Sequence, residues 1–215
     1  MRGMFVLRML LAGLFLLVSV IPGWSAPRYD DLWDIAKGAV VTASSNIYYG
    51  SNARNMLGAF EGWIEAGQGT TLFADDQVAG YVHWVRWSVP ADVTVGGFDL
   101  YAGHDGINLG RSFDHFTLLA VPAGQTNWVV IFDTDIPVPY PHTGYFEEPL
   151  LSAVFAQPIT ARDFEARFRQ HTNTQYAKGP RVIELDGLEY VPEPGSAVVL
   201  GSALAAVAAL RRRRV

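Results

Sequence analysis

Strict alternation of apolar and charged residues over positions 162–170 constrains the fold of this chain more than any other feature. Phe164, Ala166 and Phe168 fall on one side of an extended strand, and the charged residues between them fall on the other. The segment therefore predicts a half-buried antiparallel strand. Its solvent face would carry charges able to pair with one another, namely Asp163, Glu165, Arg167 and Arg169.

Other segments repeat this period-two pattern between glycine-rich and proline-containing turns. In residues 81–89, apolar side chains and His83 occupy one face, and polar residues such as Arg86 occupy the other. The apolar residues of segment 182–190 change parity part-way, and we expect Gly187 to form a bulge that resets the register. The remaining predicted strands are residues 40–44, 93–101, 113–121 and 127–132.

Between the two end segments, helical signals are confined to one short stretch. Residues 30–37 suit one or two helical turns, capped by Asp30 or Asp31 and stopped by Gly38. About eight short strands with almost no helix predict an all-β fold, a β-sandwich or jelly roll. Without the two end segments, about 165 residues remain, which is enough for one such domain.

Both ends of the chain have the features of membrane-directed segments. Residues 1–25 combine two arginines with an apolar run that is too short for a typical span, and small residues precede Ala26. We therefore predict a signal peptide, removed by signal peptidase, and a mature start at Ala26. At the other end, the uncharged segment 196–210 is followed by Arg211, Arg212, Arg213 and Arg214.

The sequence of residues 196–210 predicts a transmembrane helix that is short for a membrane span. At 1.5 Å per residue the helix would be about 22 Å long, against a hydrocarbon core of roughly 30 Å, and snorkelling arginines would supply some of the missing length. The arginine cluster holds its own end in the cytoplasm, so residues 26–190 are expected outside the inner membrane. Pro192 and Pro194 cannot continue a helix, which leaves an extended linker accessible to processing.

The C-terminal order of Val191-Pro192-Glu193-Pro194, apolar helix and arginine cluster resembles the PEP-CTERM sorting signal of Gram-negative bacteria. The resemblance covers residues 191–215. It implies that an exosortase, a membrane-embedded cysteine protease, recognises the Pro-Glu-Pro element, removes the tail, and releases the protein or attaches it at the surface. Such systems usually accompany exopolysaccharide production. The alternatives are a plain membrane anchor and a buried C-terminal helix with a basic end. Neither of them needs both the Pro-Glu-Pro element and the four arginines.

The charge composition between the two end segments limits the classes of partner that this part of the chain can bind. Six of the 16 basic residues and one of the 21 acidic residues, Glu193, lie in the end segments, so ten basic residues remain against 20 acidic ones. This acidic balance makes nucleic acid and anionic lipid poor partners. The chain has no cysteine, so its core must hold without disulfides or with the help of a metal ion.

Residues 35–45, read as I-A-K-G-A-V-V-T-A-S-S, resemble the opening of discoidin-like, galactose-binding-fold domains. In that family a G-x-x-V-T-A-S-S stretch enters the first strand. The resemblance implies a jelly-roll β-sandwich that binds carbohydrate through loops at one end. Later segments follow the family's order with less distinctive motifs, namely residues 82–89, 93–105, 116–132, 161–169 and 181–190.

Many members of this family hold a structural calcium ion near the rim of the sandwich. They use an aspartate before a glycine after the first strand, where this chain has Leu57 before Gly58. Glu184 or Asp186 would supply the carboxylate of the last strand, which is only half of such a site. We leave a structural calcium open and predict no cofactor.

Sugar recognition needs an aromatic face and planar polar groups, which loops on a rigid scaffold supply. The loops at 102–112 and 137–145 are dense in such side chains, and a glycine-flanked loop adds Trp63. Taken singly, each residue has a structural explanation, such as a turn at Asp105. As a cluster, the candidate ligand-binding residues are Trp63, His104, Asp105, Asn108, Arg111, Tyr140 and His142.

Sequence signatures of catalysis are missing. The chain has no G-x-S-x-G, H-E-x-x-H, phosphate loop or cysteine nucleophile. Asp114 and His115 adjoin in a predicted strand, where neighbouring side chains face opposite sides, so we do not expect them to cooperate. A glycosidase pair of carboxylates leaves no sequence spacing and stays open among the 21 acidic residues.

These observations predict an exported, exosortase-processed surface or matrix protein with a non-catalytic carbohydrate-binding module, linked to exopolysaccharide or biofilm. A structural surface protein that binds no specific sugar is the first alternative. A secreted glycoside hydrolase is the second.

Overall fold

Nearly all regular structure in this protein is antiparallel β-sheet. The computed structural model describes residues 31–58, 69–105, 109–138, 140 and 149–191, which belong to one compact unit, Arg28–Val191. The sheet order is β2-β7-β3-β6-β4-β5, and β1 pairs with β3. The strands are β1 (Val40–Ser44), β2 (Thr71–Leu72), β3 (Val82–Gly103), β4 (Phe113–Pro122), β5 (Val129–Asp135), β6 (Leu151–Gln170) and β7 (Arg181–Glu189), and short 3₁₀ helices form η2 (Ile35–Lys37) and η3 (Ala53–Met56).

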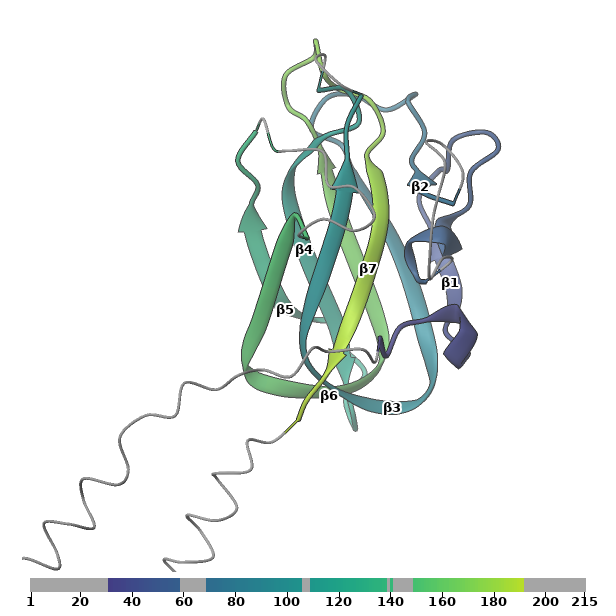
Figure 1. Ribbon diagram of the computed structural model, residues 1–215, viewed down its shortest axis with the longest axis vertical. Helices are drawn as coiled ribbons and strands as arrows, with labels where there is room; N and C mark the ends of the chain where they lie inside the picture. Colours follow the sequence, from purple (N-terminus) through teal and green to yellow (C-terminus); the bar gives the residue numbers. More distant parts are fainter. Residues whose placement is uncertain (1–30, 59–68, 106–108, 139, 141–148, 192–215) are drawn as a thin grey trace, which may run out of the picture. The chain divides into compact units, whose positions relative to one another are not determined.

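Two long strands connect the layers of this fold. The first part of β3 pairs with β1 and with the last part of β6, as Ser88 opposite Asp163 shows. After a register shift between Ser88 and Val93, β3 pairs with β7 and with the first part of β6. Both strands curve at the lower end of Figure 1, so each belongs to two layers.

The core lies between these layers and is rich in aromatic rings. Phe98, on the second part of β3, lies 5.4 Å from Phe116 of β4 and 4.9 Å from Phe132 of β5, measured between ring centroids. These strands are not paired with that part of β3, so the contacts join opposite layers. Phe164, Ala166 and Phe168 are fully buried, as predicted from their alternation.

The segment before β1 differs from the expected helix. Only residues 35–37 are helical, and Asp34 caps them by accepting a hydrogen bond from the Ala36 amide at 2.7 Å. Gly38 ends the helix with φ 95°, as expected. Asp31 instead accepts from the amides of Trp33 at 2.9 Å and Gly187 at 2.7 Å, which fastens this segment to β7.

Gly187 is not the bulge that the sequence predicts. It lies opposite Phe98 in regular pairing, and the register shifts between β3 and β7 fall elsewhere, at Val95/Gly97 and Tyr101/Ala102. The role of Gly187 is to make room for the buried indole of Trp33. A Cβ atom at this position would lie 2.5 Å from Cδ2 of Trp33.

The predicted all-β fold is confirmed, with differences in individual strands. The segments predicted at 82–89 and 93–101 are parts of one strand, and the first half of β6 and the short β2 were not anticipated. No helix within the described ranges is long and apolar enough to span a membrane. The signal segment 1–25, the processing residues Pro192, Glu193 and Pro194, the span 196–210 and the arginines 211–214 lie outside those ranges, whereas Val191 is described and exposed.

Candidate binding site at the loop end

The loop end of the sandwich is the end where β3 finishes, β4 begins and β7 begins. The β3–β4 loop is closed at its base because the Asp105 amide donates to the Gly110 carbonyl at 2.6 Å. Leu109 and Arg111 have left-handed backbone conformations, with φ of 51° and 69°. Non-glycine residues seldom adopt this conformation, which is common at functional sites. The two described ends of this loop are therefore held together beside Asp105 and Arg111, two of the predicted site residues.

Arg111 ties three segments of this end together. Its Nη1 donates to the Gly179 carbonyl at 3.1 Å, its Nη2 donates to Asp75 Oδ2 at 3.0 Å, and its Nε lies 3.5 Å from Asp105 Oδ2. The side chain is only 8% exposed. The other carboxylate oxygen of Asp75 accepts from the Gly179 amide at 3.0 Å. Arg111 thus organises the surrounding loops from below the surface.

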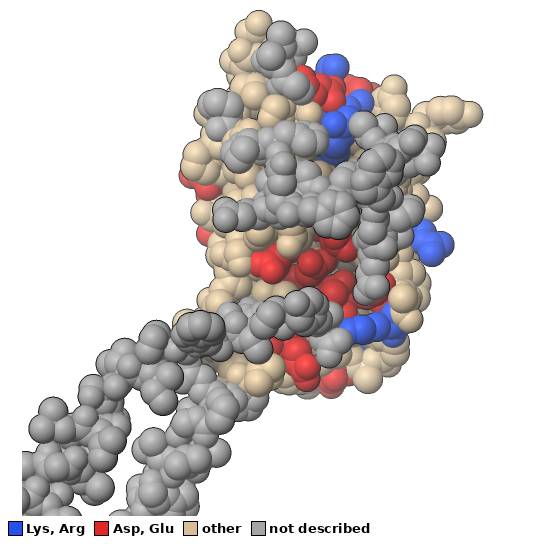
Figure 2. Space-filling view, viewed as in Figure 1, with Lys and Arg blue, Asp and Glu red and all other residues tan. Residues whose placement is uncertain are grey.

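Asp105 extends this network toward solvent. Arg181 Nη2 donates to Asp105 Oδ1 at 3.0 Å, and Lys178 Nζ lies 3.6 Å from Asp105 Oδ2. The side chain of Asp105 is 30% exposed and that of Lys178 is 54% exposed. Figure 2 shows basic and acidic side chains next to each other at this upper end. Part of the network is therefore open to a ligand.

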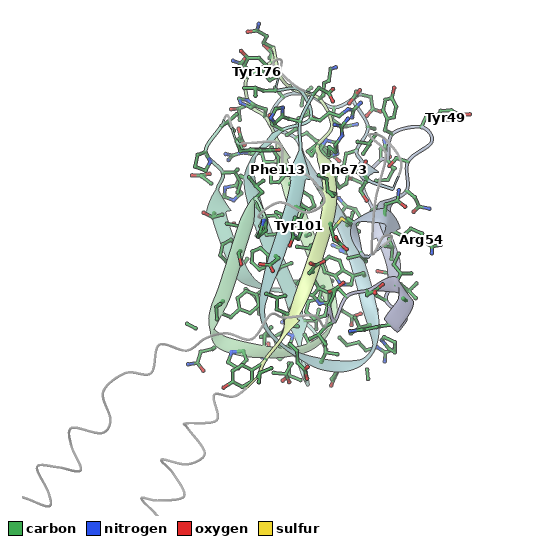
Figure 3. The ribbon with its side chains drawn as sticks, in the orientation of Figure 1. Tyr49, Arg54, Phe73, Tyr101, Phe113 and Tyr176 are labelled. Carbon is green, nitrogen blue, oxygen red and sulfur yellow. The ribbon has the colours of Figure 1, made fainter. Side chains whose placement is uncertain are left out.

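Two tyrosines before η3 provide an exposed aromatic surface beside the network. The Arg111 guanidinium carbon lies 4.8 Å from the ring centroid of Tyr48, and Tyr48 is half-exposed. The neighbouring Tyr49 is 97% exposed and points away from the sheets in Figure 3. Large aromatic side chains gain free energy when a partner covers them, so this exposure favours a stacking role.

Tyr140 and His104 lie under the loop end. The Tyr140 hydroxyl accepts a hydrogen bond from the Phe113 amide at 3.3 Å and donates to the Gly103 carbonyl at 3.5 Å. Its ring packs edge-on against His104 with centroids 5.9 Å apart. Burial raises the pKa of Tyr140 above its ordinary value, so the phenol stays neutral. These residues support the β3–β4 loop from beneath.

His83 faces the core, in agreement with its place on the apolar side of the predicted strand. Its Nε2 and Gln170 Oε1 are 2.9 Å apart, and its ring contacts Phe73 and Tyr81. Burial lowers the pKa of His83, which keeps the imidazole neutral in this setting. His83 is a core residue below the site.

The structure brings together some of the predicted residues and adds others. Asp105 and Arg111 form an ion pair, and His104 contacts Tyr140. Trp63, Asn108 and His142 lie outside the described residues. Asp75 was not among the predicted site residues, and it pairs with Arg111. Lys178, Arg181 and Tyr48 were not predicted as site residues, because they come from segments that are distant in the sequence and carry no motif.

Two hollows lie near the candidate loops. One of about 410 Å³ adjoins Tyr140 and Pro137, where the sequence predicts a binding loop, and is also lined by Leu150. Another of about 580 Å³ lies between β1 and η3, among side chains that include Ile47 and Asn52. Asp105, Arg111, Lys178 and Arg181 are not among the described residues that line either hollow. We therefore place the candidate site on the exposed surface formed by Tyr48, Tyr49, Asp105 and Lys178.

Asp114 and His115 both take part in a separate charged group around Arg169 and Asp135, contrary to the expectation that their side chains would not cooperate. A register shift at Asp114 lets its carboxylate accept from Arg169 Nε at 2.5 Å, and Arg169 Nη2 lies 3.4 Å from Asp135. His115 contacts Asp135 at 2.7 Å and Asp133 at 2.9 Å. Partial burial opposes the charged imidazole, but both carboxylates outweigh this effect and raise the pKa of His115.

Acidic side chains of β3 and β7 lie close to one another and are the candidate metal ligands of this face. Asp99 lies opposite Asp186, and Glu184 lies opposite Tyr101. Figure 2 shows acidic atoms gathered in the middle of this face. Within the described residues, no group of three histidine or acidic side chains is arranged to hold a metal ion. Leu57, at the position of the family's aspartate, is fully buried.

No protein-family model matches the chain, and no curated protein matches it either. Solved structures do resemble it. A family 32 carbohydrate-binding module from Streptococcus pneumoniae EndoD aligns with a TM-score of 0.53 and 16% identity, covering 75% of this chain and 100% of that chain. CBM32-3 from a family 31 glycoside hydrolase of Clostridium perfringens aligns with a TM-score of 0.54 and 10% identity, covering 73% and 94%.

A third structure, allantoicase from Saccharomyces cerevisiae, aligns with a TM-score of 0.52 and 14% identity. It covers 75% of this chain but only 43% of its own. At these identities the likeness shows the fold alone. The chain therefore shares the antiparallel β fold of these structures.

Proposed function

We propose that this chain is an exported, non-catalytic carbohydrate-binding protein that holds a glycan at the loop end. The observation that carries the proposal is the exposed pair Tyr48 and Tyr49 beside a fixed set of charged groups that includes Asp105 and Lys178. The likeness of the fold to two carbohydrate-binding modules supports the same proposal.

Each group has a chemical role in the proposed site. A tyrosine ring offers an apolar face to the C–H side of a sugar, and a fixed carboxylate such as Asp105 accepts hydrogen bonds from adjacent hydroxyls. Lys178 donates to hydroxyl oxygens from its exposed ammonium group. Arg111 acts as a positioning residue, because its donors already bind Asp75, Asp105 and Gly179. His104 and Tyr140 support the loop, and we keep Trp63, Asn108 and His142 as proposed ligand contacts.

The export and sorting part of the proposal rests on the sequence. Residues 1–25 would deliver the chain through the inner membrane of a Gram-negative bacterium, and residues 196–210 with the arginine cluster would hold it there. An exosortase would then cut at the Pro192-Glu193-Pro194 element. The processed protein would act at the cell surface or in the matrix, linked to exopolysaccharide.

A glycan array with the full chain purified in detergent tests the binding function. We expect binding to at least one extracellular polysaccharide, and at least a tenfold loss of affinity in Tyr49→Ala and in Asp105→Asn. Tyr190→Ala is the matched control, because Tyr190 is an exposed tyrosine that follows β7 at the opposite end. Equal losses in Tyr49→Ala and Tyr190→Ala would contradict the proposed location.

The same preparation separates the alternatives. If the chain binds no polysaccharide, including that of the producing organism, the structural surface protein becomes the better description. Release of reducing ends from a bound polysaccharide would favour the glycoside hydrolase.

A further inference from the structure

The outer face of the sheet carries a second group of aromatic and charged side chains, which shares no residue with the loop-end site. Trp84 and Arg86 lie on β3, directly opposite Arg167 and Glu165 of β6. Their neighbours Val85, Trp87, Phe164 and Ala166 are buried in the core, so these four point to the other face. Trp128, just before β5, completes the group, which we call the sheet-face cluster.

A buried carboxylate organises two arginines in this cluster. The Glu165 side chain is only 2% exposed, and it accepts hydrogen bonds from Arg86 Nε and from Arg167 Nε. The two arginine side chains are 41% and 40% exposed. Among the described residues, no hydrogen bond involves the Nη groups of either arginine. Two guanidinium groups share the Glu165 carboxylate through their Nε atoms, so their Nη donors remain at the surface, on a face that also carries Asp163 and Asp133.

Two indole rings fix the position of one guanidinium. The Arg86 guanidinium carbon lies 4.9 Å from the Trp84 ring centroid and 5.3 Å from the Trp128 ring centroid. Both tryptophans are partly exposed. Cation–π contact with two rings restricts the long arginine side chain before any ligand arrives.

This arrangement matches one class of ligand. Guanidinium groups bind carboxylates through two parallel hydrogen bonds, and indole rings cover the C–H faces of sugars. The chain as a whole is acidic, so a nonspecific attraction for polyanions is absent. We propose that the sheet-face cluster binds an acidic polysaccharide, with a uronate carboxylate on Arg86 and Arg167 and an adjoining sugar ring on Trp84 or Trp128. This inference rests on the proposed carbohydrate-binding function but uses different residues.

Polygalacturonate and its fully methyl-esterified form test the proposal with the full chain, by titration calorimetry. The two polymers share a backbone, and only the first has free carboxylates. We expect binding of polygalacturonate that weakens with added salt, and at least a tenfold weaker interaction with the ester. Arg86→Gln and Arg167→Gln should each reduce polygalacturonate binding at least tenfold. Arg54→Gln removes an exposed positive charge on η3 and should leave binding unchanged.

Two further variants guard against a folding defect and against confusion with the loop end. Arg167→Lys keeps the charge beside Glu165 but loses the guanidinium fork, so it should weaken binding while melting at the wild-type temperature. Tyr49→Ala should bind polygalacturonate as the wild type does. That result would support the sheet-face site even if no glycan bound at the loop end. Equal binding of the ester, or unchanged binding in Arg86→Gln and Arg167→Gln, would overturn the proposal.

Discussion

The acidic residue Asp186 makes the stability of the folded chain depend on pH. Burial raises the pKa of Asp186 to about 9, and the nearby carboxylates of Glu184, Asp31 and Asp99 add to the shift. The ordinary value is 3.8. The folded protein keeps this proton at pH values where the unfolded chain has lost it, so the free energy of unfolding falls as the pH rises between these two values.

We therefore expect the melting temperature of the wild type to fall by several degrees between about pH 7 and about pH 9. Asp186→Asn should flatten this dependence and should melt higher than the wild type at the alkaline end, because the amide carries no charge. Thermal melts followed by circular dichroism would measure both. Asp92→Asn, at an exposed position in the bend of β3, serves as control. A variant slope equal to the wild-type slope would contradict the expectation.

Single residues also show where prediction from the sequence succeeded and failed. Phe164 and Phe168 were placed correctly because strict alternation leaves one way to bury them. Gly187 was misread because a glycine within a strand indicates either a bulge or a close approach, and Trp33 is distant in sequence. Arg111 was predicted as a ligand contact, which stays a prediction; its burial was not foreseen, because Asp75 and Gly179 lie on other segments.

One hydroxyl group joins η3 to β2, and its removal should weaken that connection. Thr71 is fully buried; its Oγ1 accepts from the Met56 amide at 3.1 Å and lies 3.0 Å from the Asn52 carbonyl. Thr71→Val keeps the shape but leaves the buried Met56 amide without this acceptor. We expect a loss of about 1–3 kcal/mol in the free energy of unfolding.

Urea denaturation would measure this loss. Thr94→Val is the matched control, because the Thr94 and Thr160 hydroxyls bond each other at 2.9 Å on an exposed part of the sheet. The control should stay within about 0.5 kcal/mol of the wild type. Equal effects of the two changes would show that the Thr71 hydroxyl has no special role.

The strands themselves were largely predictable, but their continuity was not. Residues 90–92 separate two predicted strands because they contain proline and aspartate, whereas in the structure they lie in the bend of a single strand that passes from one layer to the other. The first half of β6 escaped prediction because apolar residues occupy both of its faces, so the sequence does not alternate although the burial does. Val154, for example, is largely exposed, so the usual apolar-inward pattern does not hold there.

For the molecule as a whole, the proposed sorting signal gives a test of processing. In a host that contains an exosortase, the chain with Pro192→Ala and Pro194→Ala should keep its C-terminal tail and remain in the inner-membrane fraction. The wild type should lose the tail, and immunoblotting with mass spectrometry would distinguish the two. Pro137→Ala, in the β5–β6 connection, is the control for loss of a proline. Normal processing of the double variant, or intact wild-type chain dissolved in the cytosol, would contradict the sorting proposal.

The direction of β7 has a consequence for how such a protein would work. β7 starts beside Asp105 at the loop end and runs to Glu189 at the other end, where Val191 leaves the sheet. Tyr48 and Tyr49 lie beside the start of β7, at the end of the sheet opposite Val191. A tether joined at Val191 would therefore be attached far from the aromatic surface and would leave it uncovered.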